Sequence, residues 1–233
     1  MIDLFYWPTP NGWKVSIALE ELGLPYTVRP VDITRGAQLE PEFLALNPNH
    51  RMPAIVDHAP ADGGAPITVF ESGAILVYLA NKVGRLGGAT PRERIEILEW
   101  VFWQMAGLGP MLGQLRHFKA YAPEPIPYAI ERYQNEADRL FGVIDRQLTA
   151  TGREYLAGEY SIADIASYPW ARGHKVYGID LTRFPAVAAW IERIKARPAV
   201  VRGMAVGREL VRKELDEQAK KVLFGQTADT AKR

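Results

Sequence analysis

The change of sequence pattern near residue 84 is the feature that most limits what this chain can fold into. Before it, short runs rich in β-branched and aromatic residues alternate with apolar stripes at helical spacing, whereas after it helical spacing continues alone. The glycine-rich segment 84–90 between the two parts is typical of a domain connector. The pattern therefore predicts a mixed α/β domain followed by an all-helical one.

The first part predicts the element order βαβαββα, which is that of a thioredoxin-like domain. Its first two strands are separated by one helix, so they should pair in parallel, and its last two flank a turn-rich stretch, so they should form a hairpin. Strands are predicted at residues 2–6, 26–33, 53–57 and 67–70, and helices at 15–22, 41–46 and 71–83.

The second part predicts helices with well-marked starts. Thr90 is followed by Pro91 and Glu93 in a capping-box pattern, and Ser161 with Asp164 repeats that pattern, so we interpret both pairs as structural. Further helices are predicted from Pro127 and at 162–171, 185–196 and 206–224, with a frayed end at 225–233. The predicted domains are 1–84, 90–205 and a charged C-terminal helix and tail at 206–233.

The charge balance provides no field that would attract nucleic acid or anionic lipid. Lysine and arginine total 28 against 27 aspartate and glutamate residues, so the formal net charge is +1. No apolar run has the length of a membrane-spanning helix, and the N-terminus begins with a strand pattern in place of a basic leader. We therefore expect a cytoplasmic protein without nucleic-acid or membrane partners.

The sequence contains no cysteine. This excludes structural disulfides, thiolate metal sites and a protein thiol nucleophile, so any thiol chemistry must use a thiol supplied by a ligand. His58, His117 and His174 are scattered and lack the spacing of metal ligands. We therefore predict that the protein holds no metal.

The turn at residues 8–12 (PTPNG) opens the first helix with several polar groups. The side chains of Thr9 and Asn11 and the backbone N–H groups of the turn can donate hydrogen bonds, and the prolines restrict the loop. On the residues alone a structural role is favoured over a catalytic one, with Asn11 as an N-cap and Thr9 as a turn residue. Structural roles are also open for two other residues: Ser72 can be a helix cap, and Pro53 can simply start a strand.

Four stretches together resemble the glutathione transferase family. The resemblance runs from the first strand to about residue 198, which is nearly the whole chain. The stretches are residues 8–12 (PTPNG), 47–55 (NPNHRMPAI), 70–75 (FESGAI) and 160–166 (YSIADIA). Within the family, residues 8–12, 36–38, 41–43 and 126–133 look like the bacterial Nu-class group, which reduces disulfides with two glutathione molecules or one glutathione disulfide.

The resemblance implies a thiolate site at the start of the first helix. Thr9 and Asn11 would be the catalytic pair that stabilises the ionised sulfur of glutathione. The Met52–Pro53 peptide bond would be cis. The backbone N–H and C=O of Met52, more than its side chain, would pair with the cysteine residue of glutathione like an added strand.

The resemblance also assigns contacts to the two ends of glutathione. Ser72, at a helix start, would bind the carboxylate of the γ-glutamyl group, and Glu71 would accept from its ammonium. Gln38 and Arg51 would contact the glycine end. Arg132 lies off the buried stripe of its helix, where a solvated arginine is the commoner outcome, but the Nu-class likeness makes it a ligand for a carboxylate.

An apolar stretch at residues 100–113 is interrupted by Gly107, Gly109, Pro110 and Gly113. These residues should kink the helix or loosen its packing. Most of the stretch should be core. A kinked, glycine-lined helix could also open a cleft between the domains for a second glutathione or an apolar substrate, a hypothesis that Gly109→Leu would test through turnover.

These observations predict an enzyme, a glutathione-dependent disulfide oxidoreductase of the glutathione transferase family. Its cosubstrate would be reduced glutathione, two molecules, or glutathione disulfide, and its partner a small-molecule disulfide or electrophile. One alternative is conjugation of glutathione to electrophiles or reduction of hydroperoxides at the same thiolate site. Another is a non-enzymatic binding or scaffold protein with this fold. A homodimer is expected from the resemblance.

Overall fold

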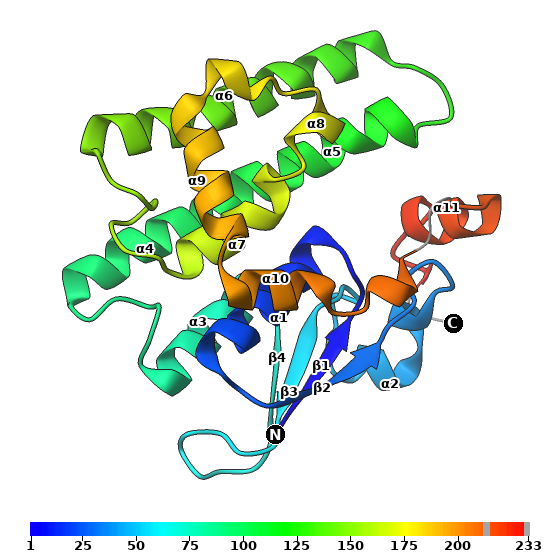
Figure 1. Cartoon of the computed structure of the whole chain (residues 1–233). Helices are drawn as coiled ribbons and strands as arrows, with labels where there is room; N and C mark the ends of the chain where they lie inside the picture. Colours follow the sequence, from blue (N-terminus) through cyan, green and yellow to red (C-terminus); the bar gives the residue numbers. More distant parts are fainter. Residues whose placement is uncertain (212–214, 231–233) are drawn as a thin grey trace. The chain divides into compact units, whose positions relative to one another are not determined.

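The computed structural model describes residues 1–211 and 215–230, and the chain divides into two compact units (Figure 1). One unit comprises Met1–Val83 with Arg202–Arg233, and the other comprises Gly84–Val201. The C-terminal segment therefore groups with the first part of the chain.

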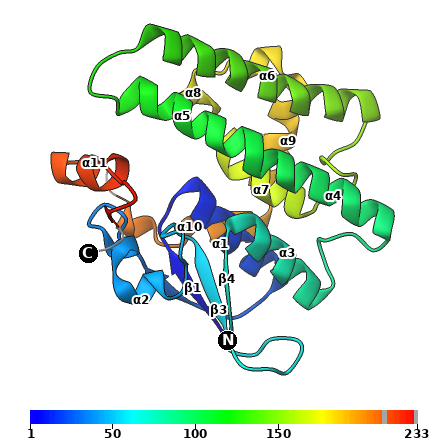
Figure 2. The ribbon, with the colours of Figure 1, turned by 180° about the vertical axis from the view of Figure 1, so that it is seen from behind.

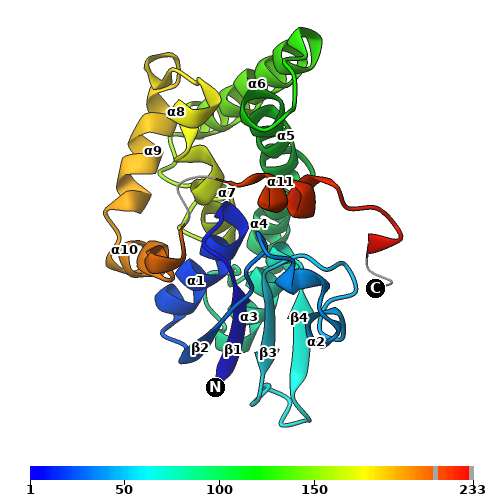
Figure 3. The ribbon, with the colours of Figure 1, turned by 90° about the vertical axis from the view of Figure 1, so that its right-hand side faces the viewer.

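The first unit contains a four-stranded mixed sheet in the order β2-β1-β3-β4 (Figure 3). β1 pairs in parallel with β2 and antiparallel with β3, and β3 pairs antiparallel with β4. The strands are β1 (Ile2–Tyr6), β2 (Tyr26–Pro30), β3 (Ala54–Asp57) and β4 (Ile67–Phe70). The predicted thioredoxin-like order is confirmed.

The helices of this unit begin or end where the sequence supplies caps. α1 (Pro10–Leu22) ends at Gly23, which takes the left-handed conformation with φ 68°. α2 is Pro41–Leu44 and α3 is Ser72–Val83, and α1 packs against α3. Fully buried aliphatic side chains of these elements form the core: Leu4, Ile17, Leu19, Ile55, Ile75, Leu76 and Leu79.

β2 is shorter than the predicted strand 26–33. β2 ends at Pro30, and Asp32 begins a turn just after it, since its Oδ1 accepts hydrogen bonds from the Thr34 N–H at 3.0 Å and from the Thr34 hydroxyl at 2.5 Å. An aspartate that bonds the backbone two residues ahead makes a turn and competes with strand pairing.

The C-terminal segment packs on β1 and α1 within the same unit. The Ser16 hydroxyl donates to the Gly203 carbonyl at 2.7 Å, and the Tyr6 hydroxyl donates to the Val206 carbonyl at 3.1 Å. A Cβ on Gly203 would lie 2.6 Å from the Ile17 Cα, so a side chain there would push the two backbones apart. The end of α10 (Pro198–Ala205) thus lies directly against α1.

The predicted helix 206–224 is wrong as a single element. The structure has a 3-10 turn at Arg208–Leu210 and a short helix α11 (Glu217–Phe224), whose start is capped by Asp216. Residues 212–214, and residues 231–233 of the predicted frayed end, lie outside the described part of the chain.

The second unit is helical, and α5 and α6 lie side by side in it (Figure 2). Thr90 caps the first helix with the predicted capping box, in which Glu93 accepts from the Thr90 N–H. The helices are α4 (Pro91–Trp103), α5 (Gly109–Ala120), α6 (Pro127–Thr151), α7 (Ile162–Ala171), α8 (His174–Tyr177) and α9 (Pro185–Lys195). The all-helical prediction for this part is confirmed. None of the helices described has the length and apolar character needed to cross a membrane.

Asp164, in the first turn of α7, is fully buried. Its Oδ1 accepts from the Trp190 indole N–H at 2.9 Å and from the Leu156 N–H at 3.1 Å, and its Oδ2 accepts from the Ser161 N–H at 3.1 Å. The capping box of α7 is therefore present as predicted, and its carboxylate also ties two other segments to the helix.

Candidate functional site

The start of α1 is capped by Thr9 and not by Asn11. Thr9 has extended backbone angles, φ −122° and ψ 165°, and its Oγ1 accepts from the Gly12 N–H at 3.3 Å. The Thr9 N–H donates to the Trp7 carbonyl at 2.8 Å. Two of the backbone donors expected for a ligand are therefore used within the turn. Asn11 lies in the first turn of the helix and is half-buried.

The Thr9 hydroxyl also contacts the loop before β3. It donates to the Met52 Sδ at 3.5 Å, although a thioether sulfur is a weak acceptor. Gly12 permits this close packing, because a Cβ there would lie 2.2 Å from the Trp7 carbonyl oxygen and 3.1 Å from the Met52 Cε. The two predicted parts of the site, at Thr9 and at Met52, thus lie together.

The loop at residues 47–53 leaves the backbone of Met52 available. The Met52–Pro53 peptide bond is cis, as the resemblance implied. The Met52 N–H and C=O make no hydrogen bond to any of the residues described. An edge of this kind can pair with an extended peptide through one donor and one acceptor.

Asn47 and Asn49 hold this loop, and neither was predicted as a site residue from the sequence. The buried Asn47 donates from Nδ2 to the Arg51 carbonyl at 2.5 Å and accepts from the Asn49 N–H at 2.8 Å. Asn49 Nδ2 then donates to Glu71 Oε1 at 3.2 Å, which links the loop to the start of α3. Asparagine on both sides of Pro48 is a turn signal that could have suggested these roles.

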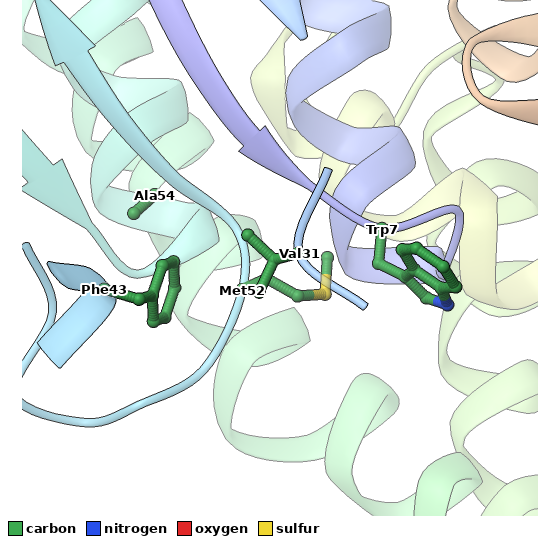
Figure 4. Close-up of a cluster of buried hydrophobic side chains, with 5 residues drawn as sticks. All are labelled: Trp7, Val31, Phe43, Met52 and Ala54. Carbon is green, nitrogen blue, oxygen red and sulfur yellow. The ribbon is translucent and has the colours of Figure 1, made fainter. Parts of the chain in front are cut away.

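The Met52 side chain has a packing role that the sequence did not indicate. It is 9% exposed and packs in an apolar cluster with Trp7, Val31, Phe43 and Ala54 (Figure 4). Because methionine is flexible, it can fill the irregular space between these side chains. The cluster anchors the loop, so the Met52 side chain has a packing role beside the ligand pairing predicted for its backbone.

The start of α3 brings Glu71 and Ser72 together. Glu71 has φ 68°, a left-handed conformation that is uncommon for a residue other than glycine and asparagine and that occurs often at functional sites. Ser72 is 6% exposed, and its Oγ accepts from the Lys14 ammonium at 3.3 Å. Lys14 was also missed in the sequence, because a lysine at this helical position looks like a surface residue.

Gln38 and Arg51 differ in accessibility. Gln38 lies in a 3-10 turn (Ala37–Leu39) and is 2% exposed, with its Nε2 donating to the Ile33 carbonyl at 3.4 Å. Its buried Oε1 has no partner among the residues described. Arg51 is exposed. A buried acceptor without a partner has a free-energy cost, so Gln38 fits a residue that gains a bond when a ligand binds.

Arg132 lies on α6 in the helical unit and lines a cavity of about 570 Å³. Phe118 and Tyr133 stack in its wall with ring centroids 5.6 Å apart. Glu136 also lines it, and the Arg139 guanidinium holds the pKa of Glu136 below its ordinary value against the effect of burial. The other lining residues are Met111, Tyr128 and Ala129. Arg132 thus has apolar and aromatic neighbours and an open cavity.

The interrupted stretch 100–113 contains a π-helical segment, Gln104–Leu108, between α4 and α5. A Cβ on Gly109 would lie 2.7 Å from Gln104 Nε2 and 3.4 Å from the Trp170 ring. Gly109 is therefore needed for packing inside this unit, and Gly109→Leu would disturb the fold before it reported on a cleft. Within the described parts of the chain, acidic and histidine side chains form no group that could hold a metal ion.

The fold and the site define a class of protein: a thioredoxin-like unit with a cis-proline loop, in which the Met52 N–H and C=O bond to none of the described residues, continued by a helical unit. Comparison with protein families identifies the class. The glutathione S-transferase N-terminal domain matches residues 9–82, and the glutathione S-transferase C-terminal domain matches residues 126–198. The chain belongs to the glutathione S-transferase family.

Two curated relatives are disulfide-bond oxidoreductases of Escherichia coli. The chain is 51% identical over 219 residues to YfcG, covering 94% of this chain and 98% of that protein. It is 40% identical over 223 residues to YghU, covering 89% of this chain and 75% of that protein.

Two similar crystal structures contain glutathione in different forms. The glutathione transferase from Burkholderia graminis, with two glutathione molecules bound per subunit, is 44% identical with a TM-score of 0.83, covering 89% of this chain and 88% of that chain. The enzyme from Pseudomonas putida, with one glutathione disulfide bound per subunit, is 42% identical with a TM-score of 0.83, covering 88% and 91%.

Proposed function

We propose that this protein is an enzyme that reduces small disulfides with glutathione, using a glutathione thiolate held at the start of α1. The observation that carries the proposal is the contact of Thr9 Oγ1 with Met52 Sδ at 3.5 Å. It puts a hydroxyl donor beside the loop whose backbone suits a peptide ligand. Because the sequence has no cysteine, the reacting sulfur belongs to the ligand.

The ligand would lie extended across three segments of the first unit. The Met52 N–H and C=O pair with the cysteine residue of glutathione, and Ser72 with the start of α3 binds the γ-glutamyl carboxylate. Glu71 accepts from the ammonium of that group. Gln38 and Arg51 serve the glycine end, where the buried Gln38 Oε1 supports the assignment.

Stabilisation of the thiolate is within reach of the groups at α1. Lowering a thiol pKa of about 8.5 by about two units takes about 2.7 kcal/mol. A hydrogen bond to a charged group contributes about 1.5–3 kcal/mol, and a helix N-terminus up to about 1 kcal/mol. Asn11 and Thr9 can supply such bonds. The Thr9 hydroxyl would exchange only a weak thioether acceptor for the thiolate.

The reaction proceeds by two thiol–disulfide exchanges. The thiolate attacks one sulfur of the substrate disulfide, forming a mixed disulfide and releasing the other half as a thiolate that takes up a proton. A second glutathione thiolate attacks the glutathione sulfur of that mixed disulfide and releases the remaining half. Two glutathione molecules are oxidised to glutathione disulfide, and the substrate is reduced to two thiols.

Arg132 would bind a carboxylate of glutathione in the helical unit. One similar structure holds two glutathione molecules per subunit and another holds one glutathione disulfide. These structures support a site in this protein that accepts two molecules or their oxidised form. A guanidinium can hold a carboxylate through two parallel bonds. A homodimer in the cytoplasm without a metal is part of the same proposal.

The test is turnover of 2-hydroxyethyl disulfide and of chlorodinitrobenzene with glutathione, for the parent and for Asn11→Ala. We expect disulfide reduction to exceed conjugation, and Asn11→Ala to lower kcat/KM for the disulfide by about 10²-fold, as for loss of one oxyanion donor. Conjugation without disulfide reduction would favour the transferase alternative. Glutathione binding without turnover of either substrate would favour a binding protein.

A further inference from the structure

A lysine ammonium is buried under the start of α3. Lys14 lies on α1, the helix that packs on α3, and its side chain is 1% exposed. Its Nζ donates to Ser72 Oγ at 3.3 Å. Lysine is almost never fully buried unless it is paired, because removing an ammonium from water is costly. A methionine would fill the same space without that cost, so the charge calls for an explanation.

Burial and a nearby carboxylate act in opposite directions on the charge of Lys14. Burial lowers the pKa of Lys14 to about 7, and the Glu71 carboxylate acts in the opposite direction. That carboxylate is itself engaged by Asn49 Nδ2 at 3.2 Å. The hydroxyl of Ser72 is neutral. A further negative charge near Ser72 would therefore favour the protonated form of Lys14.

We infer that Lys14 is a positioning residue for glutathione, which acts through Ser72 and places a positive charge behind the γ-glutamyl carboxylate. The inference rests on the proposed function, because it needs that carboxylate at Ser72. Ser72 can then accept from the ammonium while its own hydroxyl donates to the ligand. Such a chain orients the hydroxyl proton toward the carboxylate, since an ammonium cannot accept.

A protonation change on binding follows from this arrangement. Above about pH 7 much of Lys14 is neutral in the free protein, and the arriving carboxylate favours its protonation, so the complex takes up a proton. Affinity should then fall as the pH rises. Ligand binding and the charge of Lys14 are linked in both directions.

The experiment is isothermal titration calorimetry of S-methylglutathione at about pH 8 in buffers of different ionisation enthalpy. This ligand has no thiol to ionise, so the α1 site does not contribute protons. The parent should take up about 0.5–1 proton per ligand, and its Kd should rise about fivefold from about pH 7 to about pH 8.5.

Two variants separate a charge effect from a packing effect. Lys14→Met keeps the volume and removes the charge, and should bind about tenfold more weakly at about pH 7 with no Lys14-dependent uptake. Lys14→Arg stays charged, and should restore affinity without uptake. Lys175→Met, at an exposed lysine of α8, should match the parent.

The outcomes distinguish this inference from the proposed function. Binding by the parent without proton uptake, or the same uptake in parent and Lys14→Met, would overturn the role of Lys14 and leave glutathione binding intact. If the Met variant does not fold, the parent measurement still decides. No binding of either glutathione or S-methylglutathione by the folded parent would reject the proposed function itself.

Discussion

At the scale of single residues, Thr9 has two tasks that can be separated. It caps α1 through the Gly12 N–H, and its hydroxyl faces the Met52 loop. Thr9→Ala should lower the free energy of unfolding by about 1 kcal/mol and lower kcat/KM by at least about tenfold. Thr9→Ser should change both much less.

Urea unfolding and steady-state turnover of 2-hydroxyethyl disulfide would measure the two effects. If Thr9→Ala lowers stability while kcat/KM of the folded enzyme stays at the parent value, Thr9 is a cap alone, and the catalytic assignment rests on Asn11.

The sequence indicates candidate site residues more readily than it indicates the contacts that hold them. The turn at residues 8–12 and the proline at 53 carry strong local signals, because proline restricts backbone angles whatever the surrounding fold. Asn47 and Lys14 act across the chain, on Arg51 and on Ser72, and no local pattern encodes such contacts. Thr9 and Asn11 are both suitable N-cap residues and lie two positions apart. Which of them caps α1 depends on where the backbone changes from extended to helical angles, and the sequence does not determine that position.

At the scale of elements, α7 depends on the buried carboxylate of Asp164. Asp164→Asn replaces one acceptor oxygen by an NH₂ group. In the orientation that keeps the Trp190 and Leu156 bonds, that NH₂ faces the Ser161 N–H. An unmade buried bond costs about 1–3 kcal/mol, and we expect this loss of stability at about pH 4, with a smaller difference at about pH 7, where the parent buries an ionised carboxylate. Asp180→Asn is the control, because that aspartate is exposed and asparagine caps equally well.

The pH dependence gives a second measure of Asp164. Burial raises its pKa to about 6 from the ordinary 3.8, against the hydrogen bonds that favour its charge. Between these values the native state holds a proton that the unfolded chain has released, so this group's contribution to stability falls as the pH rises. Urea unfolding from about pH 4 to about pH 7 should show this fall in the parent and not in Asp164→Asn. An equal dependence of the free energy of unfolding on pH in the parent and in Asp164→Asn would contradict this role of Asp164.

Two glycines of α5 should respond oppositely to alanine. A Cβ on Gly109 would meet the fully buried Gln104 at 2.7 Å, whereas a Cβ on Gly113 would meet Trp170 at an ordinary 3.5 Å. Gly109→Ala should lower stability by about 1–3 kcal/mol, and Gly113→Ala should raise it by up to about 1 kcal/mol. Thermal unfolding would measure both, and equal shifts would contradict the packing described for Gly109.

Element starts were predictable where the sequence has a capping residue, a proline or both, as at Thr90, Ser161 and Pro127. The π-helical segment Gln104–Leu108 was not, because glycine and proline indicate only that a helix is disturbed there. The π-helical segment also packs against α7, which lies far along the chain, and no local pattern encodes that contact.

At the scale of the whole molecule, the absence of cysteine separates this enzyme from a glutaredoxin. Treating the protein with iodoacetamide and then removing the reagent should leave disulfide reductase activity unchanged, because the chain has no thiol to alkylate. Mass spectrometry during turnover should detect no disulfide between protein and glutathione. Inactivation, with glutathione absent during the treatment, would contradict a ligand-borne sulfur.

The division of the molecule into two units was only partly readable from the sequence. The glycine-rich segment 84–90 marked one change of pattern. The C-terminal segment gave no sign of its grouping with β1 and α1, because the bonds of Ser16 to Gly203 and of Tyr6 to Val206 join residues about two hundred positions apart.

The central claim is that the protein ionises the thiol of bound glutathione at the start of α1. The most direct measurement is a pH titration of the thiolate ultraviolet absorption of the saturated complex, for the parent and for Asn11→Ala. We predict that the pKa of the bound thiol is about 6.5 in the parent, compared with about 8.5 for a free thiol. In the variant its pKa should be closer to that of the free thiol. A bound thiol that titrates like free glutathione in the parent would contradict the claim.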